Sequence, residues 1–251
     1  MTPIQVSLVT FALVFGGALL GMSVCNALSE GHLRQDVKDV IKLSSGLIGT
    51  MAALVLGLLI TSAKNTYDTN STQIKQITAN VILLDLDLER YGSDAQSSRI
   101  ILRRAIPALI NQIWTEGYHA KPSAYSATAE GQELVKEIQQ LKPDTDSKRS
   151  LQARMLTATA NLIQSRLSLF TQLNDALPGP LLVTLIFWLT IIFASFGLFV
   201  RLNRIALATF VISGLSVASA IFLILEMGHP FKGLMQISGE PLRYALTPLG
   251  L

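Results

Sequence analysis

Charged residues are scarce in this sequence. Asp, Glu, Lys and Arg make up 15% of the 251 residues, whereas apolar residues make up half. The single cysteine, Cys25, excludes an internal disulfide and a cysteine-based metal site. The net charge is only +3, and the basic residues are scattered among acidic ones, so we expect no nucleic-acid partner. This composition is typical of a membrane protein and not of an ordinary soluble domain.

Residues that commonly carry out catalysis are also few. The three histidines, His32, His119 and His229, are far apart, and none forms the His-x-x-x-His pair that binds zinc on a helix. The sequence contains no phosphate-binding loop, nucleophile elbow or dinucleotide fingerprint. We therefore expect no enzymatic activity, no metal site and no cofactor.

Long uncharged stretches define the organisation of the chain. A helix needs about 20 apolar residues to cross about 30 Å of hydrocarbon. The stretches of this kind are Pro3–Leu28, Leu43–Ala63, Ala176–Val200 and Ile205–Leu225. Core helices of a soluble protein seldom run so long without a charge, so the sequence predicts an all-α polytopic protein with four transmembrane helices. We expect the first two in residues 1–63, a helical extramembrane module in 64–178, a hairpin of the last two in 179–228 and a membrane-proximal tail in 229–251.

The short links between these stretches indicate an orientation. The second link, Arg201–Arg204, leaves room only for a tight hairpin. In the first link, Leu33, Val37, Val40 and Ile41 have helical spacing, which predicts a short amphipathic interfacial helix. Both links carry basic residues: Arg34, Lys38, Lys42, Arg201 and Arg204. We expect a multi-pass protein of the inner membrane of the cell. By the positive-inside rule both links are cytoplasmic, which would put the extramembrane module outside the cytoplasm. The bias is small, because Lys64, Lys75, Lys232 and Arg243 lie on the other side.

A seven-residue repeat continues directly out of the second apolar stretch. Its positions are Tyr67, Ile74, Val81 and Leu88, with a second series at Ile77, Leu84 and Tyr91. The second transmembrane helix is therefore predicted to extend beyond the membrane until Gly92 ends it. A helix of similar length, Asp146–Leu177, is expected to pack antiparallel to this extension. Shorter helices are predicted over Ser97–Thr115, interrupted by Pro107, and over Thr128–Leu141, with a loop over 116–125.

Two of the membrane helices have faces of small or hydroxylated residues. One face consists of Gly46, Thr50, Ala53, Gly57 and Thr61, and the other includes Ser216, Ser219 and Ala220. Such a face allows close helix packing in lipid, and it can equally line a narrow water-filled path. The sequence leaves both interpretations open.

Glu226 ends the fourth apolar stretch and is followed by His229. A carboxylate at membrane depth must be paired, hydrated or protonated, so Glu226 is either a headgroup-level helix end or an ion-coordinating or gating group, with His229 beside it. The tail after it, with Pro230, Gly233 and Pro241, is expected to be re-entrant or interfacial. Arg99, Arg103 and Arg104 are predicted to form a solvated face with Asp85, Asp87 and Glu89 as partners, or alternatively an anion-binding patch.

Several segments together resemble a known family. They are Phe187-Trp188-Leu189, 193–199, 221–226, Pro230-Phe231-Lys232-Gly233-Leu234 and Glu240-Pro241-Leu242, with Gly57-Leu58-Leu59, 62–65, Asp68, Tyr91-Gly92 and Trp114. This pattern is similar to that of a widespread bacterial family of membrane proteins labelled bestrophin-like, and the resemblance covers nearly the whole chain. It implies the plan of bestrophins, which are pentameric ion channels with four membrane helices per subunit and a cytoplasmic helical region after the second. The calcium-clasp acidic cluster of bestrophins has no counterpart here, and the charge distribution indicates the opposite sidedness.

Two functions follow as hypotheses. The first is a homo-oligomeric ion channel that conducts inorganic ions, with the small-residue faces around the path and Glu226 tuning permeation or gating. The second is a non-conducting sensor or scaffold that binds partners through its extramembrane helices.

Overall fold

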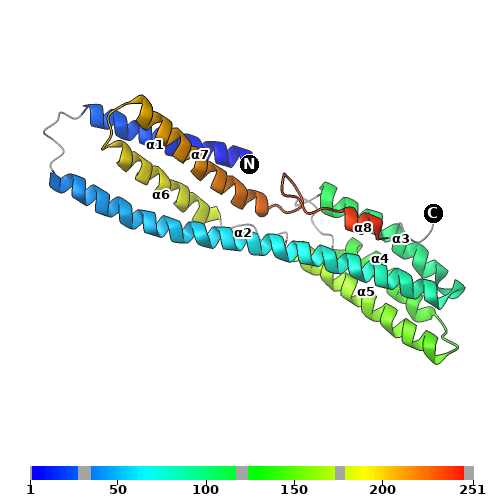
Figure 1. Cartoon of the computed structure of the whole chain (residues 1–251). Coiled ribbons are helices and arrows are strands. Elements are labelled where there is room, and N and C mark those ends of the chain that lie inside the picture. The colour runs from blue at the N-terminus through cyan, green and yellow to red at the C-terminus, as the bar shows by residue number, and fades with distance from the viewer. Residues whose placement is uncertain (1, 28–34, 117–123, 173–178, 246–251) are drawn as a thin grey trace. The chain divides into compact units, whose positions relative to one another are not determined.

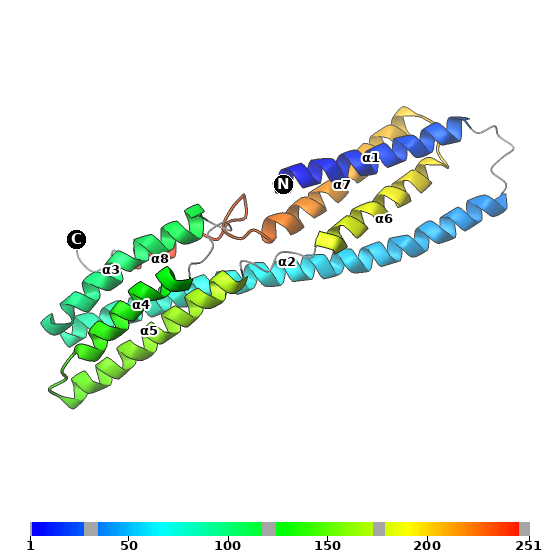
Figure 2. The same ribbon diagram turned by 180° about the vertical axis from the view of Figure 1, so that it is seen from behind.

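The computed structural model describes residues 2–27, 35–116, 124–172 and 179–245, and every regular element within these ranges is a helix. The helices form two compact units. One, Met1–Asn65 with Ala176–Gly228, contains the apolar helices and is called the membrane unit here. The other, Thr66–Asp175 with His229–Leu251, is called the extramembrane unit. Figures 1 and 2 show the helices of each unit running side by side.

Within the described part of the chain, four helices are long and apolar enough to cross a bilayer. They are α1 (Pro3–Ala27), α2 (Gln35–Tyr91), α6 (Gly179–Gly197) and α7 (Arg204–Met227). Each contains or lies within one of the uncharged stretches, since a helix satisfies its own backbone hydrogen bonds and apolar side chains can then face the hydrocarbon. The protein is an all-α polytopic membrane protein, as the sequence predicts.

The helix α2 is continuous over 57 residues, about 86 Å at 1.5 Å per residue. The prediction of a separate interfacial helix in the first link is therefore wrong, because Val37, Val40 and Ile41 belong to the first turns of α2. No proline interrupts residues 35–91, so nothing in this stretch breaks the backbone hydrogen-bond ladder. Leu33 and Arg34 lie outside the described residues.

One face of α2 is buried along most of the helix. In the membrane unit the buried positions include Ser45, Ala52, Leu59 and Ala63, and in the extramembrane unit they include Ile74, Ile77, Val81, Leu84, Leu88 and Tyr91. These spacings of three, four and seven confirm the predicted repeat and extend it back towards the start of α2. The helix ends where predicted, because Gly92 takes a φ of 103°, which side-chain-bearing residues rarely adopt.

The membrane unit has two apolar contact regions. α2 packs against α6 and α7 through Ala52, Leu59, Leu185 and Ile221, together with their neighbours. α1 packs against α6 and α7 through a second cluster: Val14, Ala18, Met22, Phe193 and Phe210. The link between α6 and α7 is short, and the Asn203 side chain caps α7 by accepting a hydrogen bond from the Ile205 N–H at 3.5 Å.

The extramembrane unit is a helical bundle around the second half of α2. Its other elements are η1 (Ser93–Ala95), α3 (Gln96–Asn111), the π-helical turn η2 (Gln112–Glu116), α4 (Ala124–Gln140), α5 (Asp146–Gln172) and α8 (Glu240–Tyr244). The expected interruption at Pro107 is wrong, because Pro107 lies inside the continuous helix α3. The α-helix changes to the π-helical turn only after Asn111. Residues 117–123 of the expected loop and the predicted end of the second long helix, 173–177, lie outside the described residues.

The C-terminal segment is part of the core of the extramembrane unit. Phe231, Ile237, Leu242 and Ala245 are buried in one cluster with apolar residues of α2, α3, α4 and α5. Trp114 anchors the segment: its Nε1 donates a hydrogen bond to the Ile237 carbonyl at 2.8 Å. The structure thus differs in part from the expected re-entrant or interfacial tail, because these four apolar side chains are covered by protein, whereas Leu234 and Met235 are exposed.

Candidate functional site

The small-residue face of α2 points away from the rest of the membrane unit. Gly46, Thr50, Ala53, Gly57 and Thr61 are all exposed, whereas the buried positions of the helix lie on a different face. A Cβ atom added at Gly46 or Gly57 would have no described atom within 4 Å. The face is therefore available to lipid, to water or to a second copy of the chain.

The hydroxyl groups on this face are already satisfied. Thr61 Oγ1 donates to the Gly57 carbonyl at 2.9 Å, and Thr50 Oγ1 donates to the Leu47 carbonyl at 2.7 Å. Both are bonds within one helix, so the hydroxyls can lie at membrane depth without loss. Their oxygens still have lone pairs with which to meet water or an ion.

A similar but less complete face occurs on α7. Ser216 and Ser219 are exposed, and their hydroxyls donate to the Ile212 and Leu215 carbonyls at 2.9 and 2.8 Å. Ala220 is half-buried. The opposite side of α7, with Ala218, Ile221 and Leu225, belongs to the buried part of the membrane unit.

Glu226 and His229 lie in different environments. Glu226, in the last turn of α7, is 3% exposed, whereas His229, after the helix end, is exposed. A carboxylate buried to this degree requires compensating interactions, and Glu226 does interact with other residues. Glu226 is thus placed to influence how α7 packs, and His229 is placed to meet solvent.

The contact between α1 and α6 depends on glycines that the sequence analysis did not single out. A Cβ on Gly21 would collide with the Ala194 carbonyl, and one on Gly197 would collide with the Ala18 carbonyl. At Gly17 the added atom would lie 2.9 Å from the Thr190 carbonyl oxygen. The two backbones therefore approach each other directly, the arrangement that small residues four apart permit in lipid. The Gly17-x-x-x-Gly21 spacing is the signal that could have predicted it.

A buried ion pair fastens α3 to α2. The Asp85 carboxylate is completely buried and accepts hydrogen bonds from Arg99 Nε at 2.8 Å and Arg99 Nη2 at 3.0 Å. The hydrogen bond to Asp85 raises the pKa of Arg99, although burial acts in the opposite direction. Arg99 Nη2 also lies 3.1 Å from Glu89 Oε2. The predicted partners are confirmed for Arg99, but the predicted solvated position is wrong for this pair, because Asp85 is in the interior.

Of the other charges expected on that face, Arg103 has a predicted partner, with its Nε 3.7 Å from Asp85 Oδ1, and the rest have different partners. Asp87, 3% exposed, pairs with Arg154 of α5 at 3.1 Å. Arg104 pairs with Glu133 of α4 at 3.1 Å in an exposed position. Arg99, Arg103 and Arg104 thus each lie near a carboxylate, but Arg103 Nη2 is buried without a hydrogen-bond partner among the described residues, so the alternative of an anion-binding patch stays a prediction.

Metal binding has no support among the described residues, where no three His, Cys, Asp or Glu side chains form a group. His32 and His119 lie outside the described residues.

These features define the protein as a polytopic membrane protein with a helical unit attached to its second membrane helix. The four apolar helices contact the lipid bilayer, and α2 leads from the membrane unit into a separate helical unit.

Residues 12–242 match the Bestrophin-like domain, which is most of the chain, and the protein belongs to this family of membrane proteins. No curated protein and no solved structure matches the chain.

Proposed function

We propose that the protein is a homo-oligomeric channel for inorganic ions in the inner membrane of the cell and has no enzymatic activity. The observation that carries the proposal is the outward face of α2, where Gly46, Thr50, Ala53, Gly57 and Thr61 are exposed. Lipid contact does not require small or hydroxylated side chains, whereas such side chains permit close subunit packing and can line a water-filled path. Membership of the Bestrophin-like family supports the channel interpretation.

In this proposal copies of the chain surround a path lined by α2, with Ser216 and Ser219 of α7 as a second lining. Glu226 acts on gating through the packing of α7, because its burial keeps it from direct contact with a permeating ion. Replacing it with glutamine keeps the shape and removes the charge, so Glu226→Gln is expected to change the open probability or its pH response.

The decisive experiment is recording from the purified protein in planar bilayers. Wild type is expected to conduct, and Gly57→Phe is expected to reduce or abolish the current because the added ring fills the path. Gly16→Phe is the matched control: a Cβ at Gly16 on α1 also has no described atom within 4 Å, but Gly16 is not on the proposed lining. Silence of the wild type across voltage, pH and ion composition, or equal effects of the two substitutions, would contradict the proposal.

The proposal places the extramembrane unit outside the cytoplasm, on the basis of the basic links. After Cys25→Ser removes the native thiol, His119→Cys is expected to react with an impermeant reagent added from outside. Arg34→Cys and Arg201→Cys are expected to be protected. The opposite pattern would invert the topology and agree with the sidedness of bestrophins.

A sensor or scaffold is the second candidate, and the continuity of α2 favours it. A single helix with one buried face over most of its length can carry a displacement from the extramembrane unit into the bilayer without an ion path. The mass of the complex in a native membrane mimic separates the two candidates. A monomer or dimer with no conductance favours the scaffold.

A further inference from the structure

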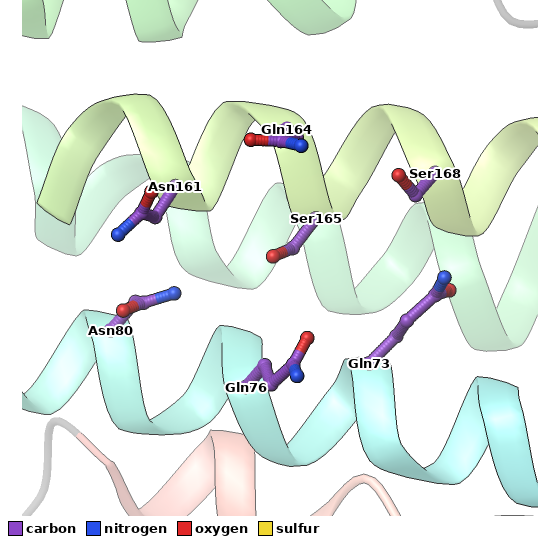
Figure 3. Close-up of a pocket in the computed structure, with 7 residues that line it drawn as sticks. All are labelled: Gln73, Gln76, Asn80, Asn161, Gln164, Ser165 and Ser168. Carbon is purple, nitrogen blue, oxygen red and sulfur yellow. The ribbon is translucent and has the colours of Figure 1, made fainter. Parts of the chain in front are cut away.

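A polar groove lies between α2 and α5 of the extramembrane unit. The two helices are antiparallel. Asp87 lies seven residues after Asn80 on α2, and its partner Arg154 lies seven residues before Asn161 on α5. Asp87 and Arg154 form an ion pair at 3.1 Å at the end of this antiparallel series. On the other side of Asn80 and Asn161 the helices leave a groove of about 340 Å³. Figure 3 shows side chains of the two helices pointing towards one another across it.

The lining of the groove is entirely neutral and polar. It consists of Gln73, Gln76, Asn80, Asn161, Gln164, Ser165 and Ser168. None of these side chains has a hydrogen bond to another residue of the described chain. Four amides and two hydroxyls are half-buried or exposed, so water can reach them.

Gln73 is different because it is buried. It is 8% exposed, and its Oε1 atom is inaccessible and has no hydrogen-bond partner within the described residues. In Figure 3 its side chain extends from α2 towards Ser168 of α5. A buried amide oxygen without a donor is unfavourable, and rotation of the Gln73 amide group would present this oxygen to a donor in the groove, from water or from a bound molecule.

The chemistry of the lining restricts what can bind. A charged ligand would lose hydration without meeting an opposite charge, because none of the lining residues is ionisable. An apolar ligand would cover polar groups without bonding to them. Each amide offers a carbonyl acceptor and two N–H donors, which matches adjacent hydroxyls that both donate and accept. The volume is at the lower end of the range of about 300–1,000 Å³ typical of small-molecule pockets.

We propose that this groove binds a small, neutral, polyhydroxylated molecule, which bridges α2 and α5 through the amides on both walls. The site does not depend on ion conduction, so it can be tested whether or not the protein is a channel. Binding ties α5 to the helix that continues into the membrane unit.

The test is calorimetric titration of the full-length protein in lipid nanodiscs with sorbitol, glucose, myo-inositol and trehalose. Gluconate and glucosamine serve as charged counterparts of sorbitol and glucose. At least one neutral compound is expected to bind saturably, and its charged counterpart at least tenfold more weakly. Gln73→Leu and Asn161→Leu, on opposite walls, are each expected to weaken binding at least tenfold.

Two matched control variants remove exposed hydroxyls that lie on the same helices but outside the groove. Thr72→Ala and Thr157→Ala each remove a side chain bonded only to its own helix, to the Asp68 and Ala153 carbonyls, and are expected to leave binding unchanged. Gln73→Glu adds a further test that does not rely on loss: it is expected to shift the preference from glucose to glucosamine.

Several outcomes would overturn the proposal. They are no saturable binding of any neutral compound by the wild type, equal binding of sorbitol and gluconate, or unchanged binding in the groove variants. A change in the mass of the oligomer caused by Gln73→Leu or Asn161→Leu, with no effect on polyol binding, would assign the groove to contact between copies of the chain.

Discussion

Replacing Asp85 with asparagine tests whether the buried ion pair fastens α3 to α2. The substitution keeps the size of the side chain and one acceptor oxygen, but it leaves the Arg99 guanidinium, 15% exposed, without its main counter-charge. Glu89 remains at 3.1 Å, but its side chain is 51% exposed and gives only partial compensation. Breaking a buried pair costs about 3–5 kcal/mol, and the remaining partner argues for the lower end, about 3 kcal/mol.

The measurement is thermal unfolding of the full-length protein in detergent, followed by circular dichroism and by the fluorescence of Trp114 and Trp188. For a chain of this size about 1 kcal/mol corresponds to about 2–4 °C, so the midpoint is expected to fall by about 6–12 °C. Glu133→Gln is the control, because it breaks an exposed pair with Arg104 worth about 0–1 kcal/mol. The double variant Asp85→Asn/Arg99→Gln is expected to recover part of the loss, since it removes the Arg99 charge, whereas the charge of Arg103, whose Nε lies 3.7 Å from Asp85, remains. Equal midpoints for Asp85→Asn and Glu133→Gln would refute the reasoning.

Two further predictions concern α1 and the end of α2. Gly21→Leu is expected to prevent the α1–α6 contact and abolish a monodisperse peak in gel filtration, whereas Gly16→Leu, with open space around the added atoms, is expected to behave like wild type; the same profile for both would contradict backbone contact between the helices. Burial raises the pKa of Tyr91 above its ordinary value of 10.0, and the Lys148 charge partly opposes this. Folding therefore favours the neutral phenol, and this stabilisation is present below about pH 10 and lost as pH rises through the folded-state pKa. Tyr91→Phe is expected to flatten the alkaline part of the plot of stability against pH, and to cost nothing near neutrality because the Tyr91 hydroxyl has no hydrogen-bond partner among the described residues; an unchanged alkaline slope would count against this assignment.

The features that were predictable from the sequence are those marked by a regular spacing of residues or by an uncharged stretch of a certain length. The membrane helices follow from uncharged stretches, since the bilayer imposes one length on each of them. The extension of α2 follows from the spacing of Ile74, Val81 and Leu88, and its end follows from Gly92. These signals are local, so a single sequence carries them in full.

The features that were missed depend on contacts between distant segments. Nothing near Asp85 in the sequence indicates that α3 will cover it, so its depth could not be predicted although its partner Arg99 was. The apolar residues of the tail, such as Phe231 and Leu242, are equally suited to lipid and to a protein core, and only the folded structure decides between them. The groove between α2 and α5 combines residues from opposite ends of the extramembrane module, and no short motif marks it.

The membrane unit contains one small-residue face that was predicted from the sequence and one that was missed. The face from Gly46 to Thr61 was identified by its spacing, and the structure adds that no other described part of the chain covers it. The α1–α6 contact was missed although Gly17 and Gly21 have the same kind of spacing. A run of small residues identifies a helix face, but its partner depends on the rest of the fold.

The backbone contact between α1 and α6 has a consequence for biosynthesis. α1 ends at Ala27 and α6 begins at Gly179, so roughly 150 residues must be synthesised before the partner exists. At about 5–20 residues per second this takes about 8–30 s. During that interval Gly17 and Gly21 would face lipid or another nascent helix with their backbone uncovered. The membrane unit must therefore assemble after its helices have entered the bilayer, and a chaperone or insertase that shields α1 during the delay would act on the glycine face.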